Sequence, residues 1–407
     1  MKTFALFLLL AVSILIPGCQ GISPSSPAEK PVAEPPRAAE FVYAANLGTL
    51  SNPGGSISGF LVNQQSGELA PVPGSPFPAG DSPGGITSDP SGHHVFVIEG
   101  KDRLVSFCSE AKGILLSENI EPHSGRLLLA DKVTLDGFCP QSMAVDPEGK
   151  TLYVSEETTD TTGSQNGGEI QAFTIEQNGT LTEIPGSPLP VAGGAGALAM
   201  HPGGKLLYVV TGMDTQGIEV FGPGHAIVVF DRDQQTGRLG PARAVAVGSQ
   251  AHLAIAPSGR LMIGQNISTM NQVVLFSIDP ASGELTPQTP MARSLPWAVA
   301  VDPLSEFVAL TVIPLATNNV PGDIQIFRID DSTSTMAQVP GTPVAAGNGP
   351  NAVKFDLQGK LVYSVETNGN LIDGFMLDRS TGSLTPVPGS PFKAGDAPEE
   401  LTIASPK

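Results

Sequence analysis

One histidine and one glutamate are the candidates for acid–base chemistry in this chain. If the protein is an enzyme, we expect His252 to act as general base and Glu156 as its supporting carboxylate. Three further histidines, His93, His94 and His201, lie in or beside sequence turns, and no spacing pairs two histidines as metal ligands. The chain has no Gly-x-Ser-x-Gly nucleophile elbow and no dinucleotide fingerprint. The sequence therefore predicts no metal site and no cofactor.

The acidity of the chain argues against partners that carry phosphate. Its 407 residues have a formal net charge of −18, so nucleic acid and anionic lipid surfaces would repel it. The chain has 47 glycines and 38 prolines, yet 40% of its residues are hydrophobic. This composition predicts a soluble, folded body with many turns rather than a disordered chain.

The N-terminal residues predict an export signal and a tether. Residues 1–18 have one positive charge and an apolar run of signal-peptide length, and Ile16-Pro-Gly-Cys19 resembles the bacterial lipoprotein box, whose cysteine is lipidated. The alternative is an ordinary cleaved signal with an incidental cysteine. Residues 19–39 have the Pro, Ser and Ala content of an extended tether. We therefore expect a monomer of the bacterial cell envelope, anchored through Cys19 on the periplasmic or outer-membrane face. That compartment permits disulfides, so Cys108 and Cys139 are a candidate pair.

Three sequence marks recur along residues 40–407 and divide them into units of roughly fifty residues. The first is a phenylalanine in an alternating, strand-like run, at Phe60, Phe107, Phe173, Phe230, Phe276, Phe327 and Phe375. The second is a Gly-x-Leu step a few residues later, at Gly67, Gly125, Gly179, Gly237, Gly283, a degenerate Thr335-Met336, and Gly382. The third is a turn of the Asp-Pro-x-Gly type before another strand, at Asp89, Asp146, His201, Ala256, Asp302 and Asp356. No segment has the pattern of a long amphipathic helix.

The two ends of this region complete each other. The third mark occurs six times, and the chain stops halfway through a seventh, at residues 401–407. Its missing partner strand is Phe41-Val-Tyr-Ala-Ala-Asn46. We therefore predict an all-β fold: one seven-bladed β-propeller of four-stranded antiparallel blades over residues 40–407. Its ring closes by pairing of the N- and C-terminal strands within one blade.

A proline-rich phrase occurs near both ends of the predicted ring. It reads Pro-Val-Pro-Gly-Ser-Pro-Phe at residues 71–77 and again at 386–392. Because it follows the Gly-x-Leu step, it belongs to the outermost strand of a blade. Proline has no N–H to donate, so we expect these residues to protect an exposed sheet edge.

Strand ends such as Tyr43-Ala-Ala-Asn46, Gly-x-Leu hairpins and Asp-Pro-x-Gly turns together resemble the seven-bladed lactonase propeller family, which includes 6-phosphogluconolactonase and carboxymuconate cyclase. The resemblance covers the chain after the tether. It implies hydrolysis of a lactone at the top of the central channel, by residues in a His-Pro-His run, a Pro-Arg-His run, a glutamate and further arginines.

This chain departs from that pattern at the positions that would carry the chemistry. The His-Pro-His run reads Cys139-Pro-Gln141, and the Pro-Arg-His run reads Ala195-Gly-Ala197. Trp297 stands where an arginine is common, and His252 lies about where the glutamate is expected. An anionic lactone needs cationic or hydrogen-bonding groups aimed at its developing oxyanion, so these departures weaken the implied activity.

The repeat predicts which side chains surround the mouth of the channel. Counting back from the turns, the innermost strands begin near Gly84, Gln141, Gly196, Ala251, Trp297, Asn351 and Glu400. The following strands end at Asn46, Glu99, Glu156, Thr211, Gln265, Thr311 and Glu366. Carboxylates, amides and one aromatic ring suit a cation, a glycan or other polyol, or a basic peptide. The alternative is a polar rim that only keeps water in the pore.

Two functions therefore follow from the sequence. The first is a small-molecule, glycan or peptide-binding module of the cell envelope, built on a lactonase scaffold whose catalytic positions are replaced. The alternative is a lactone hydrolase, a carboxylic ester hydrolase, with a diverged channel site. Fold alone does not decide between the two.

Overall fold

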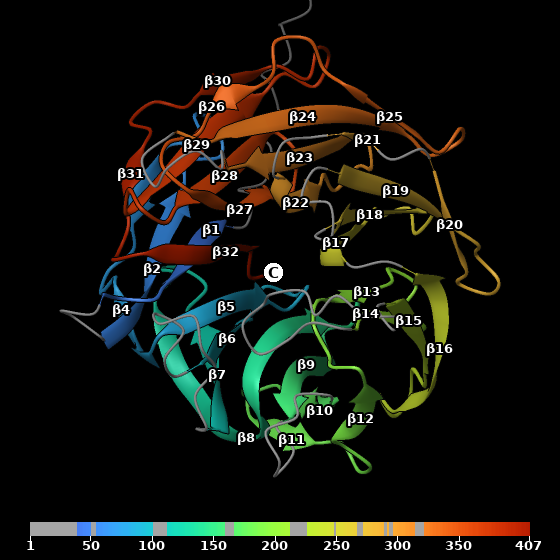
Figure 1. Ribbon diagram of the computed structural model, residues 1–407. Coiled ribbons are helices and arrows are strands. Elements are labelled where there is room, and N and C mark those ends of the chain that lie inside the picture. Colours follow the sequence, from blue (N-terminus) through green and yellow to red (C-terminus); the bar gives the residue numbers. More distant parts are fainter. Residues whose placement is uncertain are drawn as a thin grey trace, which may run out of the picture. The chain divides into compact units, whose positions relative to one another are not determined.

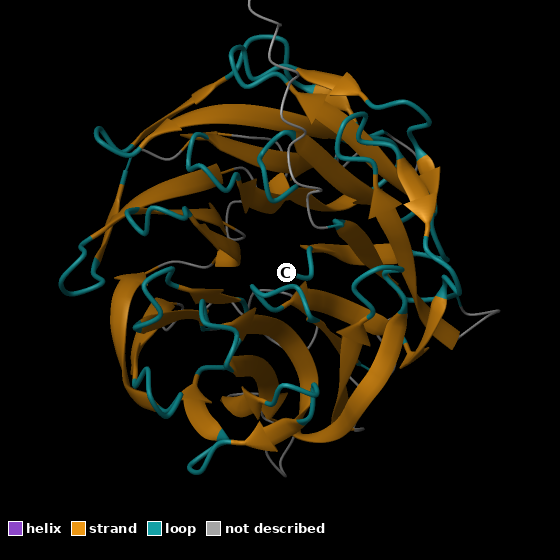
Figure 2. Ribbon diagram, turned by 180° about the vertical axis from the view of Figure 1, so that it is seen from behind, coloured by secondary structure: helices purple, strands orange, loops and turns teal. Residues whose placement is uncertain are grey.

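The computed structural model describes residues 39–49, 54–100, 112–158, 167–211, 226–247, 250–266, 272–288, 291–292, 296–313 and 321–407. These residues form strands, turns and loops without a helix (Figures 1 and 2). Accordingly, they include no helix long and apolar enough to cross a membrane. Cys19 and the predicted signal and tether lie outside them, as does Cys108.

The strands form seven blades, numbered I to VII, and the strands of each blade are named from the channel outward. Blade I has β32 (Pro398–Ala404), β1 (Phe41–Asn46), β2 (Gly54–Val62), and an outer strand in two pieces, β3 (Leu69–Pro71) and β4 (Phe77–Asp81). Blade II has β5 (Pro83–Ser88), β6 (His94–Glu99), β7 (Lys112–Ile120) and the first part of β8 (Leu127–Val145). Blade III has the last part of β8, β9 (Thr151–Thr158), β10 (Gly167–Ile175), β11 (Leu181–Glu183) and β12 (Leu189–Ala192). The long strand β8 therefore belongs to two blades.

The remaining four blades repeat this arrangement. Blade IV has β13 (Leu198–Met200), β14 (Leu206–Val210), β15 (Ala226–Arg232) and β16 (Leu239–Val247). Blade V has β17 (Gln250–Ile255), β18 (Leu261–Asn266), β19 (Gln272–Ile278), β20 (Leu285–Pro287) and β21 (Met291–Ala292). Blade VI has β22 (Pro296–Val301), β23 (Phe307–Val312), β24 (Asp323–Asp330), β25 (Thr335–Gln338) and β26 (Val344–Ala345). Blade VII has β27 (Pro350–Phe355), β28 (Leu361–Glu366), β29 (Leu371–Leu377), β30 (Leu384–Pro386) and β31 (Phe392–Lys393).

The ring is closed. The innermost strands β32, β5, β8, β13, β17, β22 and β27 each contact the next, and β27 contacts β32 again (Figure 1). The N-terminal β1 pairs antiparallel with the C-terminal β32, from Phe41 opposite Ala404 to Asn46 opposite Pro398. The predicted seven-bladed propeller, its four-stranded antiparallel blades and its closure by the two terminal strands are confirmed.

Apolar side chains fill the spaces between neighbouring blades. The buried apolar residues that the structure describes form seven clusters, one at each blade–blade interface. The second strand of a blade packs on both faces, which is why β1, β6, β23 and β28 are buried along their whole length. Each blade is therefore held mainly by its two neighbours.

Four tyrosines add a hydrogen bond between blades. Their hydroxyls donate to carbonyl oxygens in the Gly-x-Leu turn of the next blade, at 2.6–2.9 Å: Tyr43 to Gly125, Tyr153 to Gly237, Tyr208 to Gly283 and Tyr363 to Gly67. All four side chains are buried. Because the chain has four tyrosines in total, every one of them links two blades.

The proline-rich phrase lies at the outer edge of the blade, where it joins the two pieces of the outermost strand: β3 to β4 in blade I and β30 to β31 in blade VII. Blades I, III and VII share the sequence Pro-Gly-Ser-Pro at this place. Its serine accepts a backbone N–H from the neighbouring strand: Ser75 from Gly59, Ser187 from Ala172 and Ser390 from Gly374, at 2.9–3.0 Å. The peptide bond after each of these serines is cis. The serine hydroxyl thus accepts a backbone N–H that would otherwise be unpaired where the outer strand is interrupted.

One predicted mark was wrong. Phe107 lies outside the described residues, and Glu118 of β7 occupies the place that phenylalanine holds in the other six blades, opposite Val95. Glu118 is buried, and burial raises the pKa of its carboxyl to about 7. The sequence does indicate that Glu118 takes the place of the phenylalanine. Gly125 of the Gly-x-Leu step follows Glu118 at the same distance at which Gly382 follows Phe375.

Candidate functional site

The candidate site is the mouth of the central channel where the innermost strands begin. Because every blade repeats one meander, all seven innermost strands start at the same end of the ring. Six of them carry a register shift, typical of a β-bulge, where the innermost strand begins: β5, β8, β17, β22, β27 and β32. In the long β8 this place is residues 138–142, where the strand enters blade III. A bulge leaves a residue outside the ladder and redirects its side chain.

The residues predicted to end the second strands are buried. Their side chains are at most 9% exposed: Asn46, Glu99, Glu156, Thr211, Gln265, Thr311 and Glu366. A binding role for them stays a prediction, but in this structure they bond to backbone.

Three of these glutamates hold the crossover that brings the chain in from the preceding blade. Carboxylate oxygens of Glu99, Glu156 and Glu366 accept the backbone N–H of Asp81, Gly137 and Asn348, at 3.2, 2.9 and 2.9 Å. The glutamates lie directly against glycines of these crossovers: a Cβ on Gly347 would be 1.8 Å from the carboxyl carbon of Glu366. The carboxylates therefore position loops around the mouth.

The neutral residues at these strand ends are also hydrogen-bonded, but to residues of neighbouring strands. The Asn46 amide donates to both Ser56 and Ser58, and Thr311 Oγ1 accepts the N–H of Ala298 at 2.9 Å. Thr211 donates to the Ala226 carbonyl, and the Gln265 amide donates to the Pro296 carbonyl. The glutamates of this ring thus hold crossovers, whereas its neutral residues bond to neighbouring strands.

The predicted catalytic pair is not brought together. Glu156 is fully buried in blade III, whereas His252 is exposed on blade V, with blade IV between them. Burial raises the pKa of Glu156 to about 9, and Glu169, directly opposite on β10, adds to the shift by repulsion. A glutamate that is neutral at physiological pH does not supply a supporting carboxylate to a histidine.

The residues that start the innermost strands are the accessible ones. Trp297 is 44% exposed, His252 is exposed, Gln141, Asn351 and Glu400 are partly exposed, and Gly84 and Gly196 are buried. The side chain of Ala251 lies outside the described ones. Of the predicted channel residues, Trp297, His252, Gln141, Asn351 and Glu400 are therefore the ones with described solvent exposure.

The structure adds Glu399 to the site. The register of β32 shifts between Glu400 and Pro398, so Glu399 is the bulged residue and the equivalent of Asn351. Counting back from a turn failed in this blade because its turn is split between the two termini. A preceding proline could have identified the position. Pro398 precedes Glu399, and a proline also precedes Gln141, Trp297 and Asn351.

Trp297, Asn351, Glu399 and Glu400 form what we call the mouth patch. They lie on the innermost strands of blades VI, VII and I, which are consecutive in the ring and in contact. The Asn351 amide donates to the Glu399 carboxylate, and Lys354 forms an ion pair with Glu400 at 3.2 Å. An exposed indole ring beside an amide and carboxylates offers a stacking face and hydrogen-bond acceptors.

Metal ligation receives no support from the described residues. No group of three or more His, Cys, Asp or Glu side chains among them is arranged to hold a metal ion. Cys139, beside the mouth residue Gln141, is disulfide-bonded and has a positive φ of 49°. Since Cys108 lies outside the described residues, the predicted Cys108–Cys139 pair stays a prediction.

Comparison with known proteins places the fold. Residues 167–302 match the family model of the seven-bladed lactonase β-propeller. Curated proteins include no match to the chain. A candidate 6-phosphogluconolactonase from Bacteroides fragilis has a similar structure, with a TM-score of 0.70 and 18% identity over 93% of this chain and 100% of that one. The periplasmic gluconolactonase of Pseudomonas aeruginosa has a TM-score of 0.67 and 15% identity over 91% of this chain and 100% of that one. The predicted resemblance is confirmed, and at these identities the structural likeness concerns the fold.

Proposed function

We propose that this lactonase-type propeller is an envelope protein that binds a neutral polyhydroxylated ligand, such as a glycan, at its channel mouth. The observation that carries the proposal is the mouth patch, in which Trp297 is exposed on blade VI and the next two blades present Asn351 and Glu399. Sugar rings offer an apolar face to an aromatic side chain and hydroxyls to carboxylates and amides.

The charge of the mouth patch favours a neutral ligand over an anionic one. Glu399 and Glu400 contribute two carboxylates, and the neighbouring Lys354 is already paired with Glu400. A phosphorylated or carboxylated ligand would meet these carboxylates, in a chain with a net charge of −18. A neutral sugar avoids this repulsion.

A glycan array followed by calorimetry with the best-bound neutral glycan tests the proposal. Trp297→Ala removes the stacking face and is expected to weaken binding by about tenfold. Asn351→Ala is expected to weaken it as well. Leu304→Ala is the matched control, because Leu304 is 59% exposed on the same blade but lies in the turn after its innermost strand. The proposal fails if no glycan binds or if Trp297→Ala binds like the parent.

Hydrolysis of a neutral sugar lactone is the second candidate function. It is favoured by the structural likeness to a protein named as a periplasmic gluconolactonase and to a candidate 6-phosphogluconolactonase. His252, on the innermost strand that contacts the strand of Trp297, is the accessible base for such a reaction. Gluconolactone should then be hydrolysed faster by the parent protein than by His252→Ala, and faster than 6-phosphogluconolactone. Equal background rates for both proteins would exclude this function.

The cellular setting of the proposal rests on the N-terminal sequence. We propose that Cys19 is lipidated and that the propeller lies in the envelope space at the end of the 19–39 tether. Cys19→Ser is then expected to move the protein from the membrane fraction to the soluble envelope fraction. Incorporation of labelled palmitate into the parent protein alone would support the anchor, and labelling of neither protein would contradict it.

A further inference from the structure

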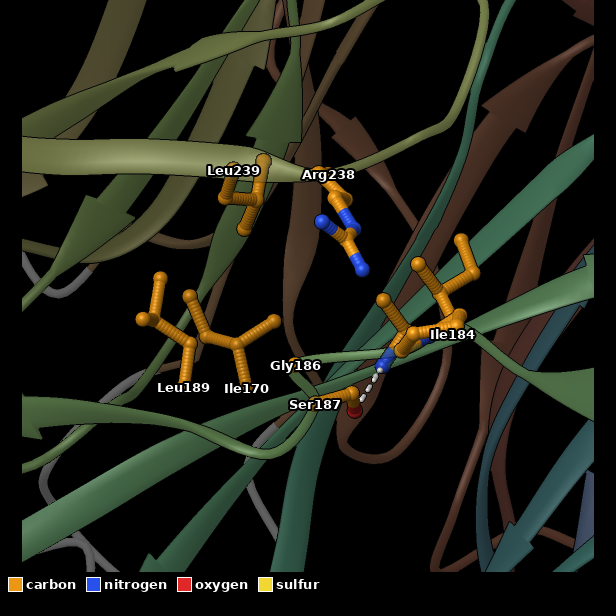
Figure 3. A pocket seen from close by; sticks show the side chains of 9 residues that line it. Ile170, Ile184, Gly186, Ser187, Leu189, Arg238 and Leu239 are labelled. Atoms are coloured by element: carbon orange, nitrogen blue, oxygen red, sulfur yellow. Dashed lines mark hydrogen bonds between the residues drawn. The ribbon is translucent and has the colours of Figure 1, made fainter.

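A cavity lies between the outer strands of blades III and IV, away from the mouth patch. It has a volume of about 250 Å³. Its walls are mainly apolar, and Figure 3 shows Ile170, Ile184, Leu189 and Leu239 around it, with Arg238 extending over it. The backbone at Gly186 forms part of the wall.

Two sister blades, I and VII, show what can fill this place. Leu189 lies opposite Ile170 in the strand register, as Phe77 lies opposite Ile57 in blade I and Phe392 opposite Ile372 in blade VII. The Phe77 ring lies between two glycines, 3.1 Å from a Cβ built on Gly59 and 3.4 Å from one built on Gly74.

Blade VII repeats this arrangement, and blade III lacks it. The Phe392 ring lies 3.3 Å from a Cβ built on Gly374 and 3.2 Å from one on Gly389. In blade III the equivalent of Gly389 is Gly186, and a Cβ there would have no atom within 4 Å. The cavity is therefore the place of a phenyl ring that Leu189 does not supply.

The rim of the cavity is cationic. Arg238 follows the Gly237 turn as Glu68 follows the Gly67 turn, so an arginine stands here where the blade VII–blade I interface has a glutamate. The guanidinium forms no hydrogen bond or ion pair with any residue that the structure describes, although the chain is strongly acidic. Figure 3 shows it directed toward the Gly186–Ser187 wall.

We propose that this cavity binds a small aromatic carboxylate, with the ring in the apolar space and the carboxylate on Arg238. An apolar cavity of about 150 Å³ is enough for a benzene ring, so the volume here admits a ring with a short side chain. Ala172 carries a methyl group where blades I and VII have Gly59 and Gly374. This methyl keeps a ring closer to the surface than Phe77 lies, and therefore closer to Arg238.

Calorimetric titration of the full chain with 3-phenylpropionate tests the assignment. We expect saturable binding at roughly millimolar Kd, as for a ligand of this size with one charged contact. Leu189→Phe with Ala172→Gly copies the residues of blade VII and is expected to weaken binding at least tenfold while leaving the unfolding midpoint unchanged. Arg238→Gln is expected to weaken 3-phenylpropionate about fivefold and to leave neutral 3-phenylpropanol unaffected.

Arg126→Gln is the matched control, because Arg126 follows the Gly125 turn of blade II as Arg238 follows Gly237, and it should bind 3-phenylpropionate like the parent. The assignment is overturned if the double variant binds unchanged or if the alcohol binds as tightly as the acid. It is also overturned if only a peptide ending in phenylalanine, and not 3-phenylpropionate, occupies the cavity.

Discussion

Glu156 shows how a single residue can resemble a catalytic group and serve the backbone instead. Its carboxyl accepts the Gly137 N–H at 2.9 Å, and its other oxygen is buried without a partner among the described residues. A charged carboxylate in that position would lack the second hydrogen bond that water supplies outside. Burial therefore favours the protonated form, which can still accept the Gly137 N–H.

The raised pKa of Glu156 makes stability depend on pH. The folded pKa of about 9 exceeds the ordinary value of 4.5, so the folded chain holds an extra proton between these values and stability falls as pH rises through this window. Glu156→Gln imitates the neutral carboxyl. Relative to the parent, the variant should gain at least about 1 kcal/mol in the free energy of unfolding between pH 6 and pH 8. Urea unfolding at both pH values measures this gain.

Glu148→Gln is the control for that experiment. Glu148 is exposed, and its hydrogen bond to Lys150 lowers its pKa, so it stays charged through the same window. Its variant should therefore follow the pH dependence of the parent. A Glu156→Gln protein whose stability falls with pH as steeply as the parent's would contradict the protonated anchor.

The sequence predicted where the mouth residues lie on their strands better than it predicted how far each side chain is exposed to solvent. Counting from the turns located Gln141, Trp297 and Asn351 at the mouth, because the repeat fixes where each innermost strand begins. It did not distinguish these from the strand-end residues such as Glu366, whose burial depends on a crossover loop that folds over the side chain. It also did not separate Glu399 from Glu400, because a bulge changes which of two neighbours points out.

At the scale of the strand, the outer edge of a blade is stabilised by side-chain hydrogen bonds as well as by backbone hydrogen bonds between strands. The serine of the Pro-Gly-Ser-Pro phrase accepts a backbone N–H that the interruption of the outer strand leaves unpaired. A buried backbone donor without an acceptor is costly, so this hydroxyl matters more than its place at the sheet edge would indicate.

Removing the hydroxyl should therefore destabilise the blade. Ser75→Ala and Ser390→Ala leave the N–H of Gly59 and of Gly374 without an acceptor, and each is expected to lower the free energy of unfolding by about 1–2 kcal/mol. Chemical denaturation followed by circular dichroism measures the loss. Ser66→Ala is the control, since Ser66 accepts a hydrogen bond only in an exposed turn and should cost under about 0.5 kcal/mol. Equal losses at Ser66 and Ser75 would refute the interpretation.

Most strands were predictable because the sequence marks correspond to physical requirements. The Gly-x-Leu step needs a glycine of positive φ, which Gly67, Gly179 and Gly382 provide. Blade II was misplaced at Phe107 because its third strand holds Glu118, and a buried glutamate breaks the apolar pattern by which a strand is recognised. No sequence pattern predicts that β8 runs from blade II into blade III without a break. Whether a strand continues from one blade into the next depends on tertiary contacts.

At the scale of the molecule, one blade holds the ring closed. β32 is both the innermost strand of blade I and the partner of β1, and it contacts the innermost strands of blades II and VII. The seven interface clusters form a ring in which each blade depends on two neighbours. Loss of one closing strand therefore weakens two interfaces at once.

A chain that ends at Ala397 tests this dependence. It lacks β32, leaves β1 without its partner, and exposes Tyr43 and its neighbours at the blade I interfaces. We expect it to unfold at a markedly lower temperature and with a broader transition than the parent, measured by calorimetry. A synthetic peptide of residues 398–407 should restore part of the loss. The control ends at Ser405, after the last paired residue, and an unchanged midpoint in the shorter chain would disprove closure by β32.

The distribution of aromatic residues described above has an optical consequence. The single tryptophan is exposed at the mouth, while all four tyrosines are buried between blades. Emission excited near 295 nm, where tyrosine hardly absorbs, therefore comes from one place on the surface, whereas tyrosine emission reports on the packing of four blade interfaces. The protein thus carries two separate intrinsic probes, one for occupancy of the mouth and one for integrity of the ring.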